Sequence, residues 1–244
     1  MSGHSHFSSI KHKKAITDAK RGKIFSKLAR QISIAAKEKG GNPETNPALR
    51  LAIERAKSFN LPKENIERAI KKGIGKTEEA KLEKVIYEAY GPGGIAIIIE
   101  GITDNTNRTL NEIKQILNQN NGKLAGEGSV KWLFERKGII TIDPGHQAPN
   151  IKTKEEIELL AIEAGAEDIY PSNHYLDIYT KPEKTEEVKK ILEEKGIKIE
   201  SATLGWKTKN LIQVNEKDKQ NAQKLFEELD ENDAVQEIYS NIQT

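Results

Sequence analysis

Cationic side chains are concentrated at the N-terminal end of this chain of 244 residues. Residues 1–37 contain nine Lys or Arg residues and one acid, Asp18, although the formal net charge of the whole chain is only +2. Lysine contacts phosphate as a point charge, and arginine contacts it through two parallel hydrogen bonds. This concentration of charge is typical of a protein that binds a polyanion. The alternative is a solvated surface helix that has no partner.

Charge of opposite sign is separated along the chain. Residues 1–80 contain 18 basic and eight acidic residues, a net charge of +10, and residues 81–137 carry +1. Residues 138–206 carry −6 and residues 207–244 carry −3. Nucleic acid attracts the first segment and repels the acidic ones, so we expect it to be bound from one side of the molecule. The acidic region is then left for a protein partner or for steric positioning.

The basic segment has the periodicity of a helix. Apolar residues including Ile24, Leu28 and Ile32 recur at spacings of three and four residues, which predicts a helix from Asp18 to Gly40-Gly41 with one buried face. A neighbouring stripe, which we call the basic ridge, consists of Lys20, Lys23, Lys27 and Arg30. A row of cations along one helix suits a phosphate backbone.

Residues 1–14 are too polar to form a core, and they predict a basic arm that becomes ordered on its target. The predicted nucleic-acid contacts of the arm and the helix are Lys11, Lys13, Lys14, Lys20, Arg21, Lys23, Lys27 and Arg30. His4, His6 and His12 raise the alternative of a metal site. The chain has no cysteine and no carboxylates clustered near them, so no metal site is predicted.

The sequence does not favour an enzyme. HExxH, GxxxxGK[ST], GxSxG and paired Cys/His motifs are absent, and the absence of cysteine excludes thiol chemistry. The acids are spread over predicted helix surfaces, as in Glu155, Glu156 and Glu158. We therefore expect no catalytic residues and no cofactor.

No run of 18 apolar residues is present, so we expect no membrane partner. The N-terminus lacks the apolar segment of a secretion signal, and with no cysteine in the chain this favours a cytoplasmic protein.

Two further helices complete an N-terminal helical domain. Asn46 and Pro47 predict the start of one, and Leu61-Pro62 opens another that ends at Gly73. After Lys84 the pattern changes to strands at 84–90 and 95–102, joined by the GPGG of residues 91–94. This glycine-rich segment leads into a strand and not into a helix, so we interpret it as a turn and not as a phosphate-binding loop.

A helix over 106–119 is predicted next, capped by Asn105 or Thr106. Arg108 lies in its first turn, where a cation opposes the helix dipole, so it has either a local carboxylate partner or a ligand; the local partner is favoured. A strand over 131–136 follows.

Residues 138–206 predict the order βαββαβ, which matches a ferredoxin-like unit. The remaining residues predict a strand at 211–214, a helix at 217–230 and a strand at 235–239, which would join the segment before residue 138 in a second such unit. The predicted class is α+β with three domains, the third inserted in the second. Their bounds are 1–78 for the basic helical domain, 79–137 plus 207–244 for the second, and 138–206 for the acidic third.

A ferredoxin-like sheet also raises the question of RNA binding through stacked aromatic rings. Tyr175 and Tyr179 share one face of a predicted strand, but Asp177 lies between them and the segment is acidic. We therefore expect half-exposed tyrosines or a protein contact, and not a surface that stacks RNA bases.

Several motifs in order give the chain a wider resemblance. GHS at the N-terminus is followed by IKHKKAITDAKRGKIFSKL, NPALRLAIERAK, NIERAIKKG, YEAYGPGG, TDNTNRT and GSVKWLFERKG. Together they resemble the YebC family, which includes the mitochondrial translational activator of cytochrome oxidase subunit I. The resemblance covers nearly the whole chain. Where the family usually has Lys-Trp after GHS, this chain has His6-Phe7, which removes one cation and one indole from the arm.

The resemblance implies a helical N-terminal domain, two α/β domains and no established enzymatic activity. It also implies DNA-binding transcriptional regulation, or, as for some members, action as a translation factor on the ribosome. Our hypothesis is a non-enzymatic, nucleic-acid-binding regulator of gene expression. Its alternative is a ribosome-associated factor that binds rRNA or tRNA, and charge alone does not separate the two.

Overall fold

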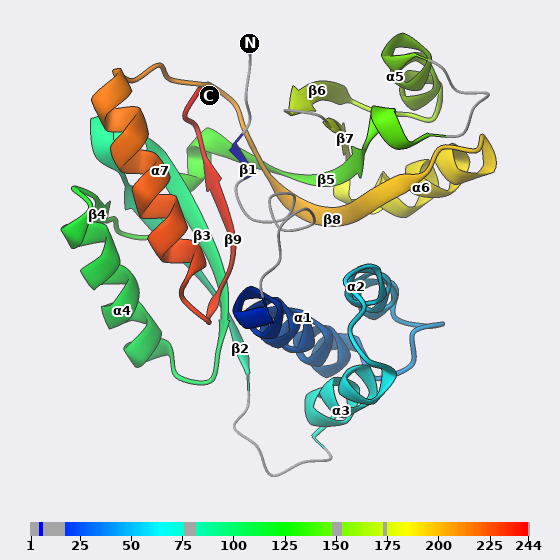
Figure 1. Ribbon diagram of the computed structural model, residues 1–244, viewed down its shortest axis with the longest axis horizontal. Helices are drawn as coiled ribbons and strands as arrows, with labels where there is room; N and C mark the ends of the chain where they lie inside the picture. The colour runs from blue at the N-terminus through cyan, green and yellow to red at the C-terminus, as the bar shows by residue number, and fades with distance from the viewer. Residues whose placement is uncertain (1–4, 7–17, 76–81, 148–152, 173–174, 244) are drawn as a thin grey trace. The chain divides into compact units, whose positions relative to one another are not determined.

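The computed structural model describes residues 5–6, 18–75, 82–147, 153–172 and 175–243 (Figure 1). The chain divides into two compact units. The helix–sheet unit contains the described residues from His6 to Lys131 together with Val214–Ser240, and the inserted unit contains Ser5, Trp132–Gln213 and the chain end from Asn241. The α+β class with one unit inserted into the sequence of another, predicted above, is confirmed.

Three helices begin the helix–sheet unit among the described residues: α1 (Asp18–Lys39), α2 (Pro47–Ser58) and α3 (Lys63–Gly73). Asn46 caps α2 by accepting a hydrogen bond from the backbone N–H of Leu49, and its side-chain nitrogen donates to the carbonyls of Ala35 and Gly40 at 2.8 Å each. One amide thus joins the end of α1 to the start of α2. The apolar stripes of the three helices form a shared core that includes Leu28, Ile32, Leu49, Ile53 and Ile66.

The sheet of this unit has the strand order β1-β9-β3-β2-β4. Its strands are β1 (Ser5–His6), β2 (Glu83–Tyr90), β3 (Ala96–Thr103), β4 (Lys123–Leu124) and β9 (Val235–Ser240). β2 pairs antiparallel with both β3 and β4, and β3 pairs antiparallel with β9. Helices α4 (Thr106–Gln119) and α7 (Glu216–Asp230) lie side by side against the sheet (Figure 1).

The segment GPGG forms the predicted turn between β2 and β3. Pro92–Gly94 is a 3-10 turn, and Gly93 and Gly94 have φ values of 69° and 77°. These left-handed conformations favour glycine, which explains the glycine pair at this position. Further 3-10 turns occupy Lys131–Leu133, Pro144–His146 and Pro182–Lys184.

The inserted unit has the predicted element order βαββαβ. Its elements are β5 (Phe134–Ile142), α5 (Lys154–Glu163), β6 (Asp168–Ser172), β7 (Tyr175–Thr180), α6 (Thr185–Glu194) and β8 (Ile199–Thr208). The strand order is β6-β7-β5-β8 with every pair antiparallel, which is the arrangement of a ferredoxin-like sheet. Its core includes Ile140, Leu176, Ile178, Val188 and Leu192.

Two expected strands differ in the structure. Residues 134–136 do not belong to the first sheet, because they continue directly into β5 and pair with β8, as Arg136 does with Trp206. In the first sheet, the partner of β2 on the side away from β3 is β4. Residues 211–214 do not form a strand, and only a single bridge joins Ile212 to Ile242. Among the described residues from Asp18 onward, the two compact units divide at 131/132, 213/214 and 240/241.

Candidate nucleic-acid interface

The basic ridge is partly engaged by acids of the same unit. Lys23 pairs with the carboxylate of Glu231 at 2.7 Å and also donates to its backbone carbonyl. Lys27 pairs with Asp230 at 2.8 Å and donates to the carbonyl of Asp230 at 2.7 Å. The Lys27 and Asp230 side chains are only 14% and 12% exposed, so this pair is shielded from solvent, whereas Glu231 is 64% exposed.

Arg30 continues the same contact. Its Nη1 donates to the backbone carbonyls of Ile102, at 3.1 Å, and Asp233, at 2.8 Å. Residues 230–233, which we call the acidic turn, therefore accept hydrogen bonds from three successive cations of α1. The acidic turn links α7 to β9. It bonds to the same cations of the ridge that were predicted to contact phosphate.

The other predicted contacts lie at the start of α1 or before it. Lys11, Lys13 and Lys14 lie outside the described residues, and so does the side chain of Lys20. Arg21 is exposed in the first turns of α1.

Helix α3 presents cations that are not among the predicted nucleic-acid contacts. Arg68 and Lys71 are exposed, and among the described residues the Arg68 side chain has neither an ion pair nor a hydrogen bond. Arg68 lines a pocket of about 360 Å³ between α1 and α3, together with Arg30 of the ridge. The cations of NIERAIKKG are visible in the sequence. Only the structure shows that α3 lies beside α1 and that Arg68 and Arg30 line the same pocket.

Two protein-family models match this chain. The model described as the TACO1/YebC protein N-terminal domain matches residues 5–76, and the model described as the TACO1/YebC second and third domain matches residues 82–242. The chain belongs to the TACO1/YebC family. The resemblance noted in the sequence is thereby confirmed.

Relatives of this TACO1/YebC chain match it over its length. A protein of Dictyoglomus thermophilum named "Probable transcriptional regulatory protein" is 50% identical and covers 99% of this chain and 95% of its own. One of Caldanaerobacter subterraneus with the same description is 48% identical and covers 100% and 98%. The crystal structure of a conserved hypothetical protein from Aquifex aeolicus is 47% identical, has a TM-score of 0.90, and covers 98% of this chain and 97% of that one.

A buried carboxylate organises one loop of this TACO1/YebC chain. Glu88, only 5% exposed, accepts hydrogen bonds from the backbone N–H groups of Gly128, Val130 and Lys131 at 2.6, 2.7 and 2.8 Å. Burial by itself raises the pKa of Glu88, but these hydrogen bonds outweigh it and hold the pKa below its ordinary value. The role of Glu88 is not visible in the sequence, because a glutamate in a strand gives no sign of a partner 40 residues away.

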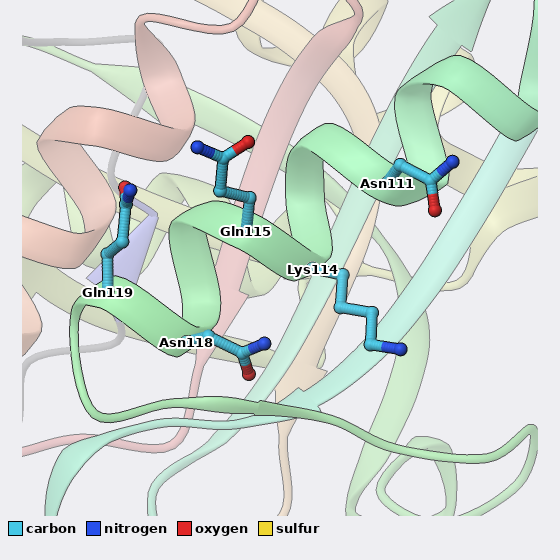
Figure 2. Close-up of a pocket in the computed structure, with 5 residues that line it drawn as sticks. All are labelled: Asn111, Lys114, Gln115, Asn118 and Gln119. Atoms are coloured by element: carbon cyan, nitrogen blue, oxygen red, sulfur yellow. The ribbon is translucent and has the colours of Figure 1, made fainter.

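The solvent-facing side of α4 carries a shallow depression of about 390 Å³ (Figure 2). Its lining consists of the exposed side chains of Asn111, Lys114, Gln115, Asn118 and Gln119. Amides and one ammonium group offer hydrogen bonds but no general base, so this depression does not suggest acid–base chemistry.

Arg108 has the local partner that was favoured. Its Nη2 lies 2.6 Å from Asp104, and Glu112 is a second carboxylate at 3.8 Å. Within the described ranges, no group of three His, Cys, Asp or Glu side chains could hold a metal ion. No helix in the same ranges is long and apolar enough to cross a membrane.

Of the two tyrosines that we expected to be half-exposed, Tyr175 is partly exposed and Tyr179 is buried. Tyr179 is 1% exposed, and its ring packs edge-on against Tyr170 with 5.7 Å between centroids. Lys207 lies over both rings and pairs with Asp168. Burial, followed by the nearby charge of Asp177, raises the pKa of Tyr179 well above its ordinary value. A ring buried in this way offers no face to an RNA base.

Proposed function

We propose that this TACO1/YebC chain is a non-enzymatic regulator of gene expression that binds nucleic acid through its N-terminal basic region. The observation that carries the proposal is the separation of charge, with +10 on residues 1–80 and −6 on residues 138–206. Phosphate contacts release counterions from nucleic acid, and a cationic region of this size supplies affinity without reading base sequence. The relatives' name, "Probable transcriptional regulatory protein", supports DNA as the first target to test.

The predicted contacts fall into two groups by their position along the chain. One group, which bonds to the acidic turn, consists of Lys23, Lys27 and Arg30. The other group precedes it along the chain and consists of Lys11, Lys13, Lys14, Lys20 and Arg21. In this proposal the residues that precede Lys23 contact the phosphate backbone directly. The residues bonded to the acidic turn attract nucleic acid at longer range, or exchange their carboxylate partners for phosphate.

The test is binding of fluorescein-labelled duplex DNA and single-stranded RNA, followed by anisotropy as a function of salt concentration. Replacing Lys11, Lys13 and Lys14 by Gln is expected to lower the slope of log K against log salt by about one for each phosphate that the variant no longer neutralises. The matched control replaces three exposed lysines of the inserted unit, Lys181, Lys190 and Lys198, by Gln. An equal change in both variants would mean that net charge acts alone and that the arm does not touch the nucleic acid.

The same protein, crosslinked by ultraviolet light in its native cell, identifies the physiological target. Recovery of promoter DNA supports transcriptional regulation. Recovery of rRNA or tRNA at a defined site replaces it by the ribosomal alternative, with the same basic region making the contact.

A further inference from the structure

A pocket of about 360 Å³ lies between α1 and α3 in the helix–sheet unit. Its size falls within the range of small-ligand sites, roughly 300–1,000 Å³. Ala29, Ala69 and Leu82 give it an apolar part. Its aromatic, polar and cationic lining includes Phe25, Ser26, Arg30, Asn65 and Arg68.

The pocket is cationic, and none of its lining residues is an acid. Arg30 uses Nη1 for the two backbone carbonyls described above, and these neutral acceptors leave its positive charge uncompensated. A guanidinium has five N–H donors, so Nε and Nη2 retain theirs. Arg68 adds a second guanidinium that has no partner among the described residues. Two such groups at one pocket suit the oxygens of a phosphate.

The walls of the pocket are held close together. Ser33 of α1 donates its hydroxyl to the carbonyl of Ala69 of α3 at 2.8 Å. At Gly73 a Cβ atom would lie 2.2 Å from the Ser33 carbonyl oxygen, so the two helices approach to a distance that only glycine allows. The pocket therefore lies mainly between two packed helices, with Leu82 before β2 completing its lining.

Phe25 gives the pocket a feature that a site for phosphate alone does not need. Its ring is half-buried and lines the same pocket as the two guanidinium groups. Aromatic side chains beside cations are the usual arrangement for a nucleotide in a single strand, in which the base stacks and the phosphate is neutralised. Asn65 and Ser26 supply polar groups of the kind that contact a base edge or a sugar hydroxyl.

We propose that this pocket holds one nucleotide of a single-stranded segment, with the phosphate on Arg30 and Arg68 and the base against Phe25. The inference rests on the proposed function, since it assigns to the nucleic acid a second contact on α3 besides the arm. In this assignment the protein recognises an unpaired nucleotide in addition to the charge of the phosphate backbone.

The experiment uses the full-length protein and single-stranded oligonucleotides that contain 2-aminopurine, whose fluorescence falls when the base stacks. Arg68→Gln is expected to weaken binding about tenfold, because the variant cannot form a charge-assisted hydrogen bond to phosphate. The matched control is Lys57→Gln, which removes one exposed cation from α2 outside the pocket. The control should change affinity less than twofold in the same buffer.

Phe25→Leu tests the stacking contact separately. It should abolish the quenching of 2-aminopurine and weaken binding about fivefold, while the salt slope stays that of the wild type. Phe25 also packs against the helical core, so thermal unfolding of the variant is measured in parallel. Arg68 is exposed, and its variant tests the pocket even if Phe25→Leu fails to fold.

The outcomes separate the pocket from the proposed function. If the wild type binds oligonucleotides and both pocket variants behave like Lys57→Gln, the pocket assignment is wrong and the proposed function stands. If the wild type binds no nucleic acid, both fail. Titration with adenosine monophosphate is the third arm: binding of this nucleotide that is abolished in Arg68→Gln, with oligonucleotide binding unchanged, would assign the pocket to a free nucleotide and overturn the strand contact.

Discussion

Glu88 shows how one buried charge is retained in this fold. A carboxylate with 5% exposure would be costly without partners, and three backbone N–H groups of the 128–131 segment supply them. The N–H groups at these three positions do not bond to backbone groups of a sheet or helix, so the carboxylate is the acceptor that they need. The side chain is thus the anchor of the loop that leads out of the helix–sheet unit.

Replacing Glu88 by Gln tests this role. At pH 7 we expect a loss of about 2 kcal/mol in the free energy of unfolding, because an amide accepts fewer of these hydrogen bonds and carries no charge. The native pKa is lowered from 4.5, so the stabilisation is complete above that value and disappears as the pH falls through the lower native pKa. Urea unfolding of both proteins should therefore give curves that converge in acid.

Glu127→Gln is the control for that comparison, since the Glu127 side chain lies exposed in the same loop. It should change stability by less than about 0.5 kcal/mol, as surface substitutions usually do. Equal unfolding free energies for Glu88→Gln and the wild type at pH 7 would show that the three hydrogen bonds contribute nothing net.

At the scale of elements, the main finding is that α1 serves two purposes. Its apolar stripe packs on α2 and α3, while its cations bond to the acidic turn between α7 and β9. A turn that presents carboxylates and carbonyls to a row of cations competes with any phosphate for the same donors. In the proposed function, phosphate therefore has to replace the acidic turn as the partner of these cations.

Asp230→Asn measures this competition. Removing the acid should raise affinity for duplex DNA about threefold at low salt, since Lys27 loses its charged partner and attracts phosphate more strongly. It should also lower stability by about 2 kcal/mol, because a shielded pair is broken. Anisotropy and thermal unfolding measure the two effects on one preparation.

Glu183→Gln makes the same change of net charge on an exposed side chain of the inserted unit and serves as the control. If Asp230→Asn binds no more tightly than Glu183→Gln, the ridge makes no contact with DNA, and its lysines serve only to hold α1 against the acidic turn.

At the scale of the whole molecule, the two units have separate hydrophobic cores. Leu49 is fully buried in the core of the helix–sheet unit and Ile178 in that of the inserted unit. Residues 138–206, within the inserted unit, carry −6, and residues 1–80, most of them in the other, carry +10. Because each unit has its own core, the surface charge of one unit does not depend on that of the other.

Calorimetry of Leu49→Ala and Ile178→Ala tests the independence of the cores. Each substitution should cost its own unit about 2–5 kcal/mol through reduced burial and the cavity left behind. We expect two resolved transitions, of which each variant lowers a different one. One transition lowered equally by both substitutions would mean that the units unfold as a single cooperative body.

Local chemistry by itself determined the helices and turns of this protein. Asn46 and Pro47 start α2, Gly40 ends α1, and the GPGG segment turns β2 into β3, as the residue types predicted. These features depend on backbone dihedral preferences and on caps within a few residues, which a sequence displays directly. The alternation of strands and helices in residues 138–206 was equally legible, and with it the ferredoxin-like order.

Tertiary structure alone decided what the chemically active side chains do. Lys23 meets Glu231 across 208 residues of sequence, and no periodicity in either segment predicts that pairing. The single strand across residues 134–142 was also hidden, because its continuity follows from pairing with β8 and not from its own composition. Charge on a helix is visible in a sequence, but whether that charge meets solvent, a carboxylate or a second basic helix depends on packing between distant segments.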